Sequence, residues 1–322
     1  MNNQFRSLGK TELKLSPIGL GTWQFSKRKN LAGKFWPVLS DEASFEIVKA
    51  SYENGVNWFD TAEFYGNGES ERTLAGALKD GGISNSDVVV ATKWMPIFRT
   101  ASSILSTIED RIKALEGYSI SLHQIHNPAS FSSIKKEMAA MAKLAEQGKI
   151  KNIGVSNFSA KQMRKAHDEL HKYGLVLASN QVHYNLLRRN IEYNGVMDTA
   201  KELGIAIIAY SPLAQGVLTG KYHENPENLK SIKGFRKRMP SFKKKSLRKT
   251  LPLINALNVI AEKHDSSPAQ IALNWLTNFH GDMVFAIPGA SSAKQAISNA
   301  STMKIKLTDE EMKLINEISK NL

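Results

Sequence analysis

Four residues with acid or base side chains stand directly behind short apolar segments of the sequence: Asp60, Tyr65, Lys93 and His126. A tyrosine hydroxyl has a pKa near ~10, too high for easy proton transfer at neutral pH. The ammonium group of Lys93 can lower the pKa of Tyr65, and Asp60 can keep Lys93 charged and in place. His126 can donate a hydrogen bond to the oxygen of a carbonyl group. Together these residue types suit protonation of a carbonyl oxygen while another group adds to its carbon.

The segments that must position these side chains alternate between strand and helix. Short runs rich in Val, Ile and Ala predict buried parallel strands, namely Ser16–Leu20, Val56–Phe59, Val88–Ala91, Ser121–Ile125, Ile153–Val155, Ala178–Val182, Ile205–Ala209 and Met283–Ile287. Amphipathic stretches between them predict helices, namely Asp41–Asn54, Glu69–Leu78, Ser132–Gln147, Ala160–Lys172, Ile191–Leu203 and Ala269–Phe279. Ser40 and Ser267 are typical N-cap residues for two of these helices.

Eight strands alternating with helices in 322 residues predict an α/β protein, a (β/α)8 TIM barrel that forms a single domain over residues 1–322. The alternative is a doubly wound open sheet, which usually carries a G-x-G-x-x-G turn. Gly19-Leu20-Gly21 gives only the first half of that motif, because residue 24 is Gln. The barrel is therefore favoured, and its active site is expected where the strands end. The four ionisable side chains would then converge on one mouth.

Two segments fall outside the strand–helix repeat. Phe5–Leu15 predicts an N-terminal β-hairpin ahead of the first barrel strand, covering the bottom of the barrel. Residues 221–250 hold eleven Lys or Arg against two Glu, which gives +9 of the chain's net charge of +13. With few strand or helix signals, this segment predicts a long basic loop after strand seven.

Composition excludes several classes of protein. No run approaches ~18 apolar residues, so no membrane span is expected, and the first six residues lack the apolar core of a secretory signal. The chain has no cysteine, which removes disulfides and thiolate sites and favours a cytoplasmic location. No His, Asp or Glu cluster has the spacing of metal ligands, so no metal is expected. Only Phe235 and Phe242 interleave with the basic residues, which disfavours nucleic-acid binding.

Motifs in a fixed order along nearly the whole chain, from Leu8-Gly9 to about Asn299, resemble those of the aldo-keto reductases. Each motif alone would be weak evidence, but many in the right order are specific. The matching stretches are Leu20–Trp23, Phe59–Glu71, Ala91–Trp94, Gln124–Pro128, Lys151–Phe158, Gln181–Asn185, Ala209–Gly216, Leu218–Tyr222 and Ile287–Gly289.

The resemblance implies an NAD(P)H-dependent enzyme that reduces small aldehydes, ketones or sugars, on a barrel without a Gly-rich dinucleotide fold. By motif match, the catalytic tetrad would be Asp60, Tyr65, Lys93 and His126, with Tyr65 protonating the carbonyl oxygen while hydride passes from the cofactor to carbon. The implied cofactor-binding residues, taken from the nicotinamide to the adenosine end, are Ser156, Asn157, Gln181, Tyr210, Ser211, Leu213, Gly216, Gly289, Ser291, Gln295 and Asn299.

The choice between NADP(H) and NAD(H) depends on a basic side chain for the 2′-phosphate. Many relatives have Arg where this chain has Ser291, and Lys294 is the one charged residue of the stretch 289–295. NADP(H) remains the expected cofactor from the resemblance. We hypothesise that Lys221 or the cluster Arg236–Arg238 supplies the missing charge.

The substrate pocket is less well defined by the sequence. Trp23 and Trp94, each at the end of a predicted strand, are candidates to line it, with packing in the core as the alternative. Asn127 stands where many aldo-keto reductases have an aromatic residue after the catalytic histidine. The shape of the pocket, the oligomeric state and the identity of the carbonyl substrate therefore do not follow from the resemblance.

Two other functional hypotheses remain open at this stage. The chain could be a cofactor-binding regulatory subunit resembling the β-subunits of voltage-gated potassium channels, which would bind cofactor tightly with little turnover. Alternatively, residues 221–250 could bind nucleic acid, with an affinity that falls steeply with salt. Measurable turnover favours the reductase over both.

Overall fold

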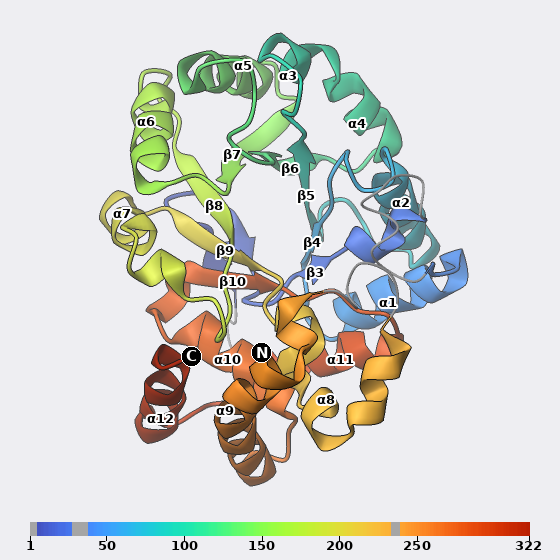
Figure 1. Ribbon diagram of the computed structural model, residues 1–322. Helices are drawn as coiled ribbons and strands as arrows, with labels where there is room; N and C mark the ends of the chain where they lie inside the picture. Colours follow the sequence, from blue (N-terminus) through green and yellow to red (C-terminus); the bar gives the residue numbers. More distant parts are fainter. Residues whose placement is uncertain (1–4, 28–37, 233–238) are drawn as a thin grey trace.

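The computed structural model describes residues 5–27, 38–232 and 239–322, and a barrel of parallel strands ringed by helices lies at its centre (Figure 1). Neighbouring strands follow chain order: β3 (Leu20–Gly21), β4 (Trp58–Asp60), β5 (Val89–Trp94), β6 (Ile120–Ile125), β7 (Ile150–Ser156), β8 (Leu177–His183), β9 (Ala206–Tyr210) and β10 (Val284–Ile287). Ile18 forms a parallel bridge with Ala286 of β10, which brings the two edges of the sheet together. This order confirms the (β/α)8 barrel and excludes a doubly wound sheet, whose strand order reverses at a switch point.

Helices follow the strands along the chain and cover the outside of the barrel. Across the described residues the α-helices are α1 (Asp41–Glu53), α2 (Glu69–Asp80), α3 (Ser102–Ser106), α4 (Ile108–Ala114), α5 (Ile134–Glu146), α6 (Ala160–His171), α7 (Val196–Leu203), α8 (Lys221–Glu224), α9 (Lys244–Lys263), α10 (Pro268–Asn278), α11 (Ala293–Ser301) and α12 (Asp309–Lys320). Short 3₁₀ segments are η1 (Trp23–Ser26), η3 (Asn190–Glu192), η4 (Ala214–Thr219), η5 (Pro226–Ser231), η7 (Pro240–Phe242), η8 (Gly281–Met283) and η9 (Thr302–Lys304). None of the helices in the described ranges has the length and apolar character that crossing a bilayer requires.

The helix ends follow the local sequence. The Ser40 hydroxyl accepts a hydrogen bond from the backbone of α1, and Ser267 forms a capping box at the start of α10, so both predicted N-caps are confirmed. The predicted helix Ile191–Leu203 is divided into η3 and α7. Gly195 lies between them with a φ of +83°, a left-handed conformation that interrupts a right-handed helix.

The predicted N-terminal hairpin is present and closes one end of the barrel. Strand β1 (Arg6–Ser7) pairs antiparallel with β2 (Lys14–Leu15). Leu8 and Leu15 are fully buried in the same apolar cluster as Leu122 and Phe285 of the barrel strands. Gly9 makes the turn at a φ of +59°, so close to the barrel that a Cβ there would lie 2.7 Å from the carbonyl oxygen of Ala178. The hairpin therefore plugs the bottom of the barrel.

The basic segment 221–250 is not the long loop that its sequence predicts. Its described part holds α8, η5, η7 and the start of α9. Four of its apolar side chains, Tyr222, Ile232, Phe242 and Leu247, form a small core together with Val217 of η4. The prediction failed because the helical turns α8, η5 and η7 are too short to show a helical repeat of apolar residues, and basic residues lie between them. Phe242 lies in this core, where it cannot stack on a nucleic-acid base, while Phe235 and Arg236–Arg238 lie outside the described residues.

Candidate active site

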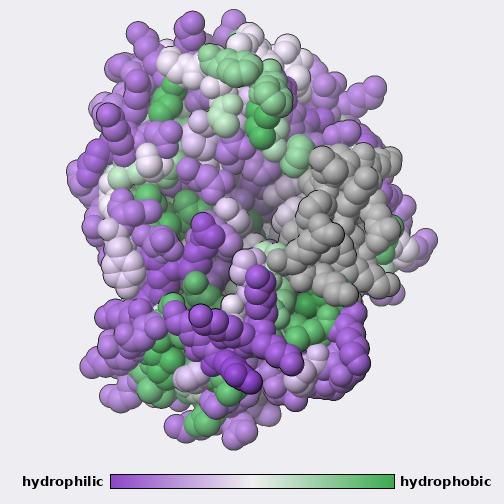
Figure 2. Space-filling model, viewed as in Figure 1, coloured by the Kyte–Doolittle hydropathy of each residue, from purple (hydrophilic) through white to green (hydrophobic). Residues whose placement is uncertain are grey.

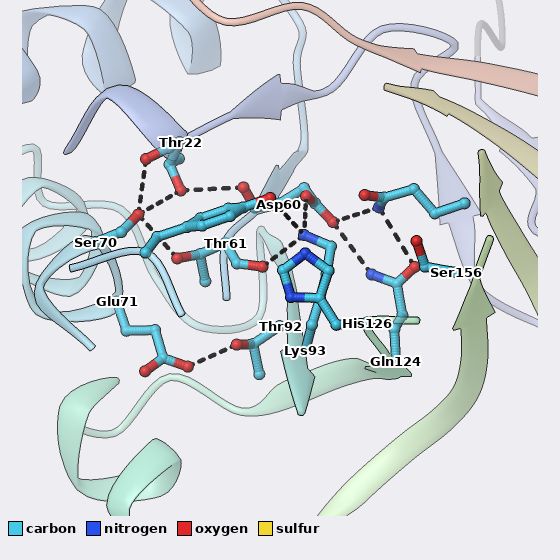
Figure 3. A network of polar contacts seen from close by, with 12 residues as sticks. Thr22, Asp60, Thr61, Ser70, Glu71, Thr92, Lys93, Gln124, His126 and Ser156 are labelled. Atoms are coloured by element: carbon cyan, nitrogen blue, oxygen red, sulfur yellow. Dashed lines mark hydrogen bonds and ion pairs between the residues drawn. The ribbon is translucent and has the colours of Figure 1, made fainter. Parts of the chain in front are cut away.

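The four predicted catalytic side chains meet at the carboxyl ends of β4, β5 and β6, and Figure 3 shows Asp60, Lys93 and His126 of the four. Asp60 ends β4 and Lys93 is the penultimate residue of β5, while His126 directly follows β6. The Lys93 Nζ atom lies 2.5 Å from Asp60 Oδ1 and 3.3 Å from the hydroxyl of Tyr65. The rings of Tyr65 and His126 are 5.8 Å apart, edge to face. Parallel strands put these residues at one edge of the sheet, as the sequence predicts.

The ion pair between Asp60 and Lys93 is withdrawn from solvent, at 1% and 0% exposure. A buried pair is favourable only where hydrogen bonds satisfy its remaining polar atoms. Here the side-chain amides of Gln124 and Gln181 donate to Asp60 Oδ2, at 3.1 and 2.8 Å. The Lys93 ammonium also donates to the carbonyl oxygen of Thr61 at 2.8 Å. The pair is therefore held in a fixed geometry from β4, β5, β6 and β8.

The electrostatics of the site keep three of these groups in defined protonation states. Burial raises the pKa of Tyr65 above its usual value, and Lys93 offsets only part of this rise. Burial alone would lower the pKa of Lys93, but Asp60 and Tyr65 beside it raise the pKa overall. Burial, aided by the charge of Lys93, lowers the pKa of His126 to about 3. At neutral pH the site thus holds a neutral phenol, an ammonium and a neutral imidazole.

One expectation needs correction at this point. The sequence suggested that Lys93 brings the pKa of Tyr65 down toward neutral pH. Lys93 does act in that direction, yet the pKa of Tyr65 is raised overall because its hydroxyl is buried. A sequence shows which charges are neighbours but not how much water they exclude, and here desolvation is the larger effect.

A cavity of about 680 Å³ opens above the tetrad, within the usual size range of small-molecule sites. It lies on the face of the molecule that is hollowed near its centre in Figure 2. Asp60, Tyr65 and His126 line it, whereas Lys93 lies buried beneath. Every residue predicted to bind cofactor lies on its wall, namely Ser156, Asn157, Gln181, Tyr210, Ser211, Leu213, Gly216, Lys221, Gly289, Ser291, Gln295 and Asn299.

Of the two tryptophans predicted to line the substrate pocket, one lies on the cavity wall and the other in the core. Trp23 lines the cavity and stacks on Tyr65, with ring centroids 6.0 Å apart. Trp94 does not line it: its side chain is 1% exposed and its indole nitrogen donates to Ser103 of α3. Side chains of successive strand residues point to opposite sides. Because Lys93 points into the mouth of the barrel, Trp94 must point out toward the helices, and its assignment to the substrate pocket is wrong.

Asn127, which the sequence analysis noted, lines the cavity beside His126, and so do two residues that it did not single out, Phe64 and Met95. Each follows a predicted strand end by a few residues, which is the signal that could have identified them. Asn127 places a carboxamide where the resemblance predicts an aromatic ring.

The loop after β9 has an unusual backbone where it borders the cavity. Ser211, Ala214 and Gln215 have φ values of +50°, +49° and +59°, followed by Gly216 at +93°. Left-handed conformations cost energy in residues other than glycine and cluster at ligand-binding sites. The side chain of Asn185 donates to the Ser211 carbonyl at 2.9 Å and holds the loop in place. These features indicate a backbone shaped for a ligand.

Comparison with known proteins agrees with this geometry. The sequence model described as the Aldo/keto reductase family matches residues 17–320. The chain belongs to the aldo/keto reductase family. It is therefore an oxidoreductase, and its barrel is the fold that the motifs predict.

Individual relatives cover almost the full length of this aldo/keto reductase. An uncharacterized oxidoreductase of Mycobacterium tuberculosis is 38% identical over 308 residues, covering 95% of this chain and 90% of the relative. The chloroplastic pyridoxal reductase of Arabidopsis thaliana is 32% identical, covering 93% of this chain and 82% of the relative. Among solved structures, the glycerol dehydrogenase of Gluconobacter oxydans has a TM-score of 0.83 and 29% identity, covering 99% of this chain and 95% of that one.

Proposed function

We propose that this aldo/keto reductase reduces small aldehydes, ketones or sugars to alcohols, with Tyr65 as the general acid. The observation that carries the proposal is the contact of the Tyr65 hydroxyl with the buried Lys93 ammonium, itself paired with Asp60. As the phenol gives its proton to the carbonyl oxygen, the adjacent ammonium stabilises the phenolate that forms. A bound reduced nicotinamide would supply the hydride that adds to the carbonyl carbon.

His126 supports the same step by orienting the substrate. Its imidazole is neutral at physiological pH because burial lowers its pKa to about 3. A neutral imidazole can donate a hydrogen bond to the carbonyl oxygen without competing with Tyr65 as the acid. Trp23 and Phe64 flank Tyr65 and His126 on the cavity wall. They would exclude water from the reacting carbonyl.

The residues of the cavity fit a nicotinamide dinucleotide. Ser156, Asn157 and Gln181 offer hydroxyl and carboxamide groups to a nicotinamide carboxamide, and they lie beside the tetrad. The Tyr210 hydroxyl donates to Asn157 at 3.1 Å, which fixes the phenol ring at the wall. The left-handed loop from Ser211 to Gly216 would run along a pyrophosphate.

We propose NADP(H) rather than NAD(H) as the cofactor. Lys221 is the one lysine or arginine that lines the cavity among the described residues, and an ammonium is a suitable partner for phosphate. Lys221→Met should then weaken binding of NADPH about tenfold and leave NADH unaffected. Lys313→Met is the matched control, because Lys313 of α12 is exposed and does not line the cavity. Equal losses for both cofactors would place Lys221 at the pyrophosphate instead and remove this argument for NADP(H).

The central experiment compares the wild-type protein with Tyr65→Phe. Binding of NADPH and NADH is followed by quenching of the fluorescence of the five tryptophans, and carbonyl reduction is assayed by cofactor oxidation. We expect cofactor affinity to be retained and turnover to fall by about 10²–10⁴-fold, the usual contribution of a general acid. Unchanged turnover would remove Tyr65 from the chemistry.

The same experiment distinguishes the reductase from a regulatory subunit, but it does not identify the substrate. Tight cofactor binding with negligible turnover in the wild type would favour a regulatory subunit. Two relatives, a pyridoxal reductase and a glycerol dehydrogenase, are named for different compounds, so a panel of aldehydes, ketones and sugars is needed.

A cytoplasmic location is part of the proposal and rests on the cysteine-free sequence.

A further inference from the structure

A buried carboxylate that the reaction does not use lies next to the tetrad. Glu63 belongs to the loop between Asp60 and Tyr65 and is 8% exposed. Its Oε1 atom accepts hydrogen bonds from the backbone N–H of Met95 and from Arg99, each at 2.5 Å. Its Oε2 atom accepts from Arg111 of α4 at 2.8 Å. Both oxygens are therefore held by groups from other segments of the chain.

Two of the partners of Glu63, Met95 and Arg99, follow Lys93 closely in the sequence. Met95 stands two residues beyond Lys93, and Glu63 stands two residues before Tyr65. The backbone N–H of Glu63 also donates to the carbonyl oxygen of Lys93 at 3.3 Å. Consecutive Cα atoms are only ~3.8 Å apart, so these two bonds join the Tyr65 loop to β5 close to the point where the phenol meets the ammonium.

Arg111 connects Glu63 to a second buried carboxylate on a neighbouring helix. Arg111 pairs with Glu63 on one side and with the buried Glu71 of α2 on the other, at 2.8 and 3.0 Å. Glu71 in turn accepts from the Thr92 hydroxyl at 2.6 Å (Figure 3), and Thr92 is the neighbour of Lys93 in β5. The loop of Tyr65 and the strand of Lys93 are thus fixed to one charged network.

We propose that Glu63 is a positioning residue, which sets the distance between the Tyr65 hydroxyl and the Lys93 ammonium through its bonds to Met95, Arg99 and Arg111. This inference rests on the proposed reductase function. The bonds of Glu63 to Met95 and Arg99 join the loop that bears the acid to the segment that follows its neighbouring charge, so they can fix the spacing of the two groups. Displacement of a reacting group by about 1 Å can cost a hundredfold in rate.

The test compares Glu63→Gln with Glu192→Gln. Glu192 is a matched control, because its side chain is 8% exposed, against 9% for Glu63, and it pairs with Arg189 away from the tetrad. We expect both variants to lose thermal stability. Only Glu63→Gln should lower kcat for carbonyl reduction, by about 10- to 100-fold, with the Kd for NADPH within twofold of the wild type. Arg99→Met, which removes one partner at a half-buried site, should lower kcat less and carries the test if Glu63→Gln does not fold.

A crystal structure of the variant gives a readout that is independent of activity. The distance from Lys93 Nζ to the Tyr65 hydroxyl should exceed the 3.3 Å of the wild type. Wild-type kcat in folded Glu63→Gln, an unchanged distance, or an equal loss of kcat in Glu192→Gln would each overturn the inference. A wild-type protein without reductase activity would instead refute the proposed function, and the distance would still decide the role of Glu63.

Discussion

Removal of the Lys93 ammonium should destabilise the protein measurably, apart from any effect on catalysis. Lys93→Met leaves the Asp60 carboxylate at 1% exposure without its partner. Removing one member of a buried ion pair costs about 3–5 kcal/mol. The lower end applies here, because Gln124 and Gln181 still donate to Asp60. With about 2.1 cal/mol/K of unfolding entropy per residue, a loss of about 3 kcal/mol corresponds to a fall in Tm of roughly 4–5 °C for a chain of this length.

The double variant Asp60→Asn/Lys93→Met separates charge burial from lost packing. Asparagine has no charge, and its side-chain oxygen can still accept from the two glutamines. The double variant should therefore regain part of the stability that Lys93→Met loses. Urea unfolding at neutral pH, followed by circular dichroism, measures the free energy of unfolding of both variants. Both are expected to be inactive, so the comparison depends on stability alone. A loss below 1 kcal/mol in Lys93→Met, or no recovery in the double variant, would refute our account of the buried pair.

Three further predictions address pH dependence and the hairpin. Burial opposes ionisation of Glu192, but hydrogen bonds from His280, Arg189 and Tyr184 lower its pKa to about 2; its contribution to stability is present above the unfolded pKa and is lost as pH falls from about 4.5 to about 2. Acid titrations should show a shallower loss of stability over that range in Glu192→Gln, and parallel curves would contradict this. The pKa of Tyr65 is raised and that of His126 is about 3, so neither group should change its protonation state between about pH 6 and pH 9. We therefore expect kcat for reduction to be constant over that range. A bell-shaped dependence of kcat on pH within it would contradict this assignment. Gly9→Ala should lower the free energy of unfolding by about 2–3 kcal/mol, because it adds a clash with Ala178 to the strain of a left-handed backbone. Gly82 has a similar φ with nothing within 4 Å, so Gly82→Ala should lower it by only about 1 kcal/mol. Equal losses of stability in thermal unfolding would show that the clash is relieved.

Most of the barrel strands could be predicted because they are largely buried on both faces and contain short runs of apolar residues. The first strand is the exception: Ser16–Leu20 was expected, and the structure has β3 at Leu20–Gly21. The residues before β3 pair with β10 only through the isolated bridge between Ile18 and Ala286, and Gly19 lies against the ring of Trp58, where a Cβ would come within 2.3 Å. Such close packing between distant residues leaves no mark in local sequence.

The meeting of Asp60, Tyr65, Lys93 and His126 beside one cavity could be predicted because strand order places these residues at one mouth of the barrel, and their roles in catalysis stay a prediction. Trp94 could also have been placed correctly, since Lys93 and Trp94 alternate along β5. The role of Glu63 could not, because its arginine partners are 36 and 48 residues away in the sequence and no periodic pattern connects them. The single-domain organisation and the cytoplasmic location stay predictions.

The plug at the bottom of the barrel has a consequence for how the chain folds during synthesis. Arg6 of the hairpin donates to the Thr277 carbonyl, 271 residues along the chain, and Ile18 pairs with Ala286. The hairpin therefore leaves the ribosome long before Thr277 and Ala286 are made. Contacts so distant in sequence form slowly, so the apolar cluster around Leu8 and Leu15 is complete only when Phe285 of β10 has been added. A chaperone that covers the hairpin would thus matter most before β10 has been made.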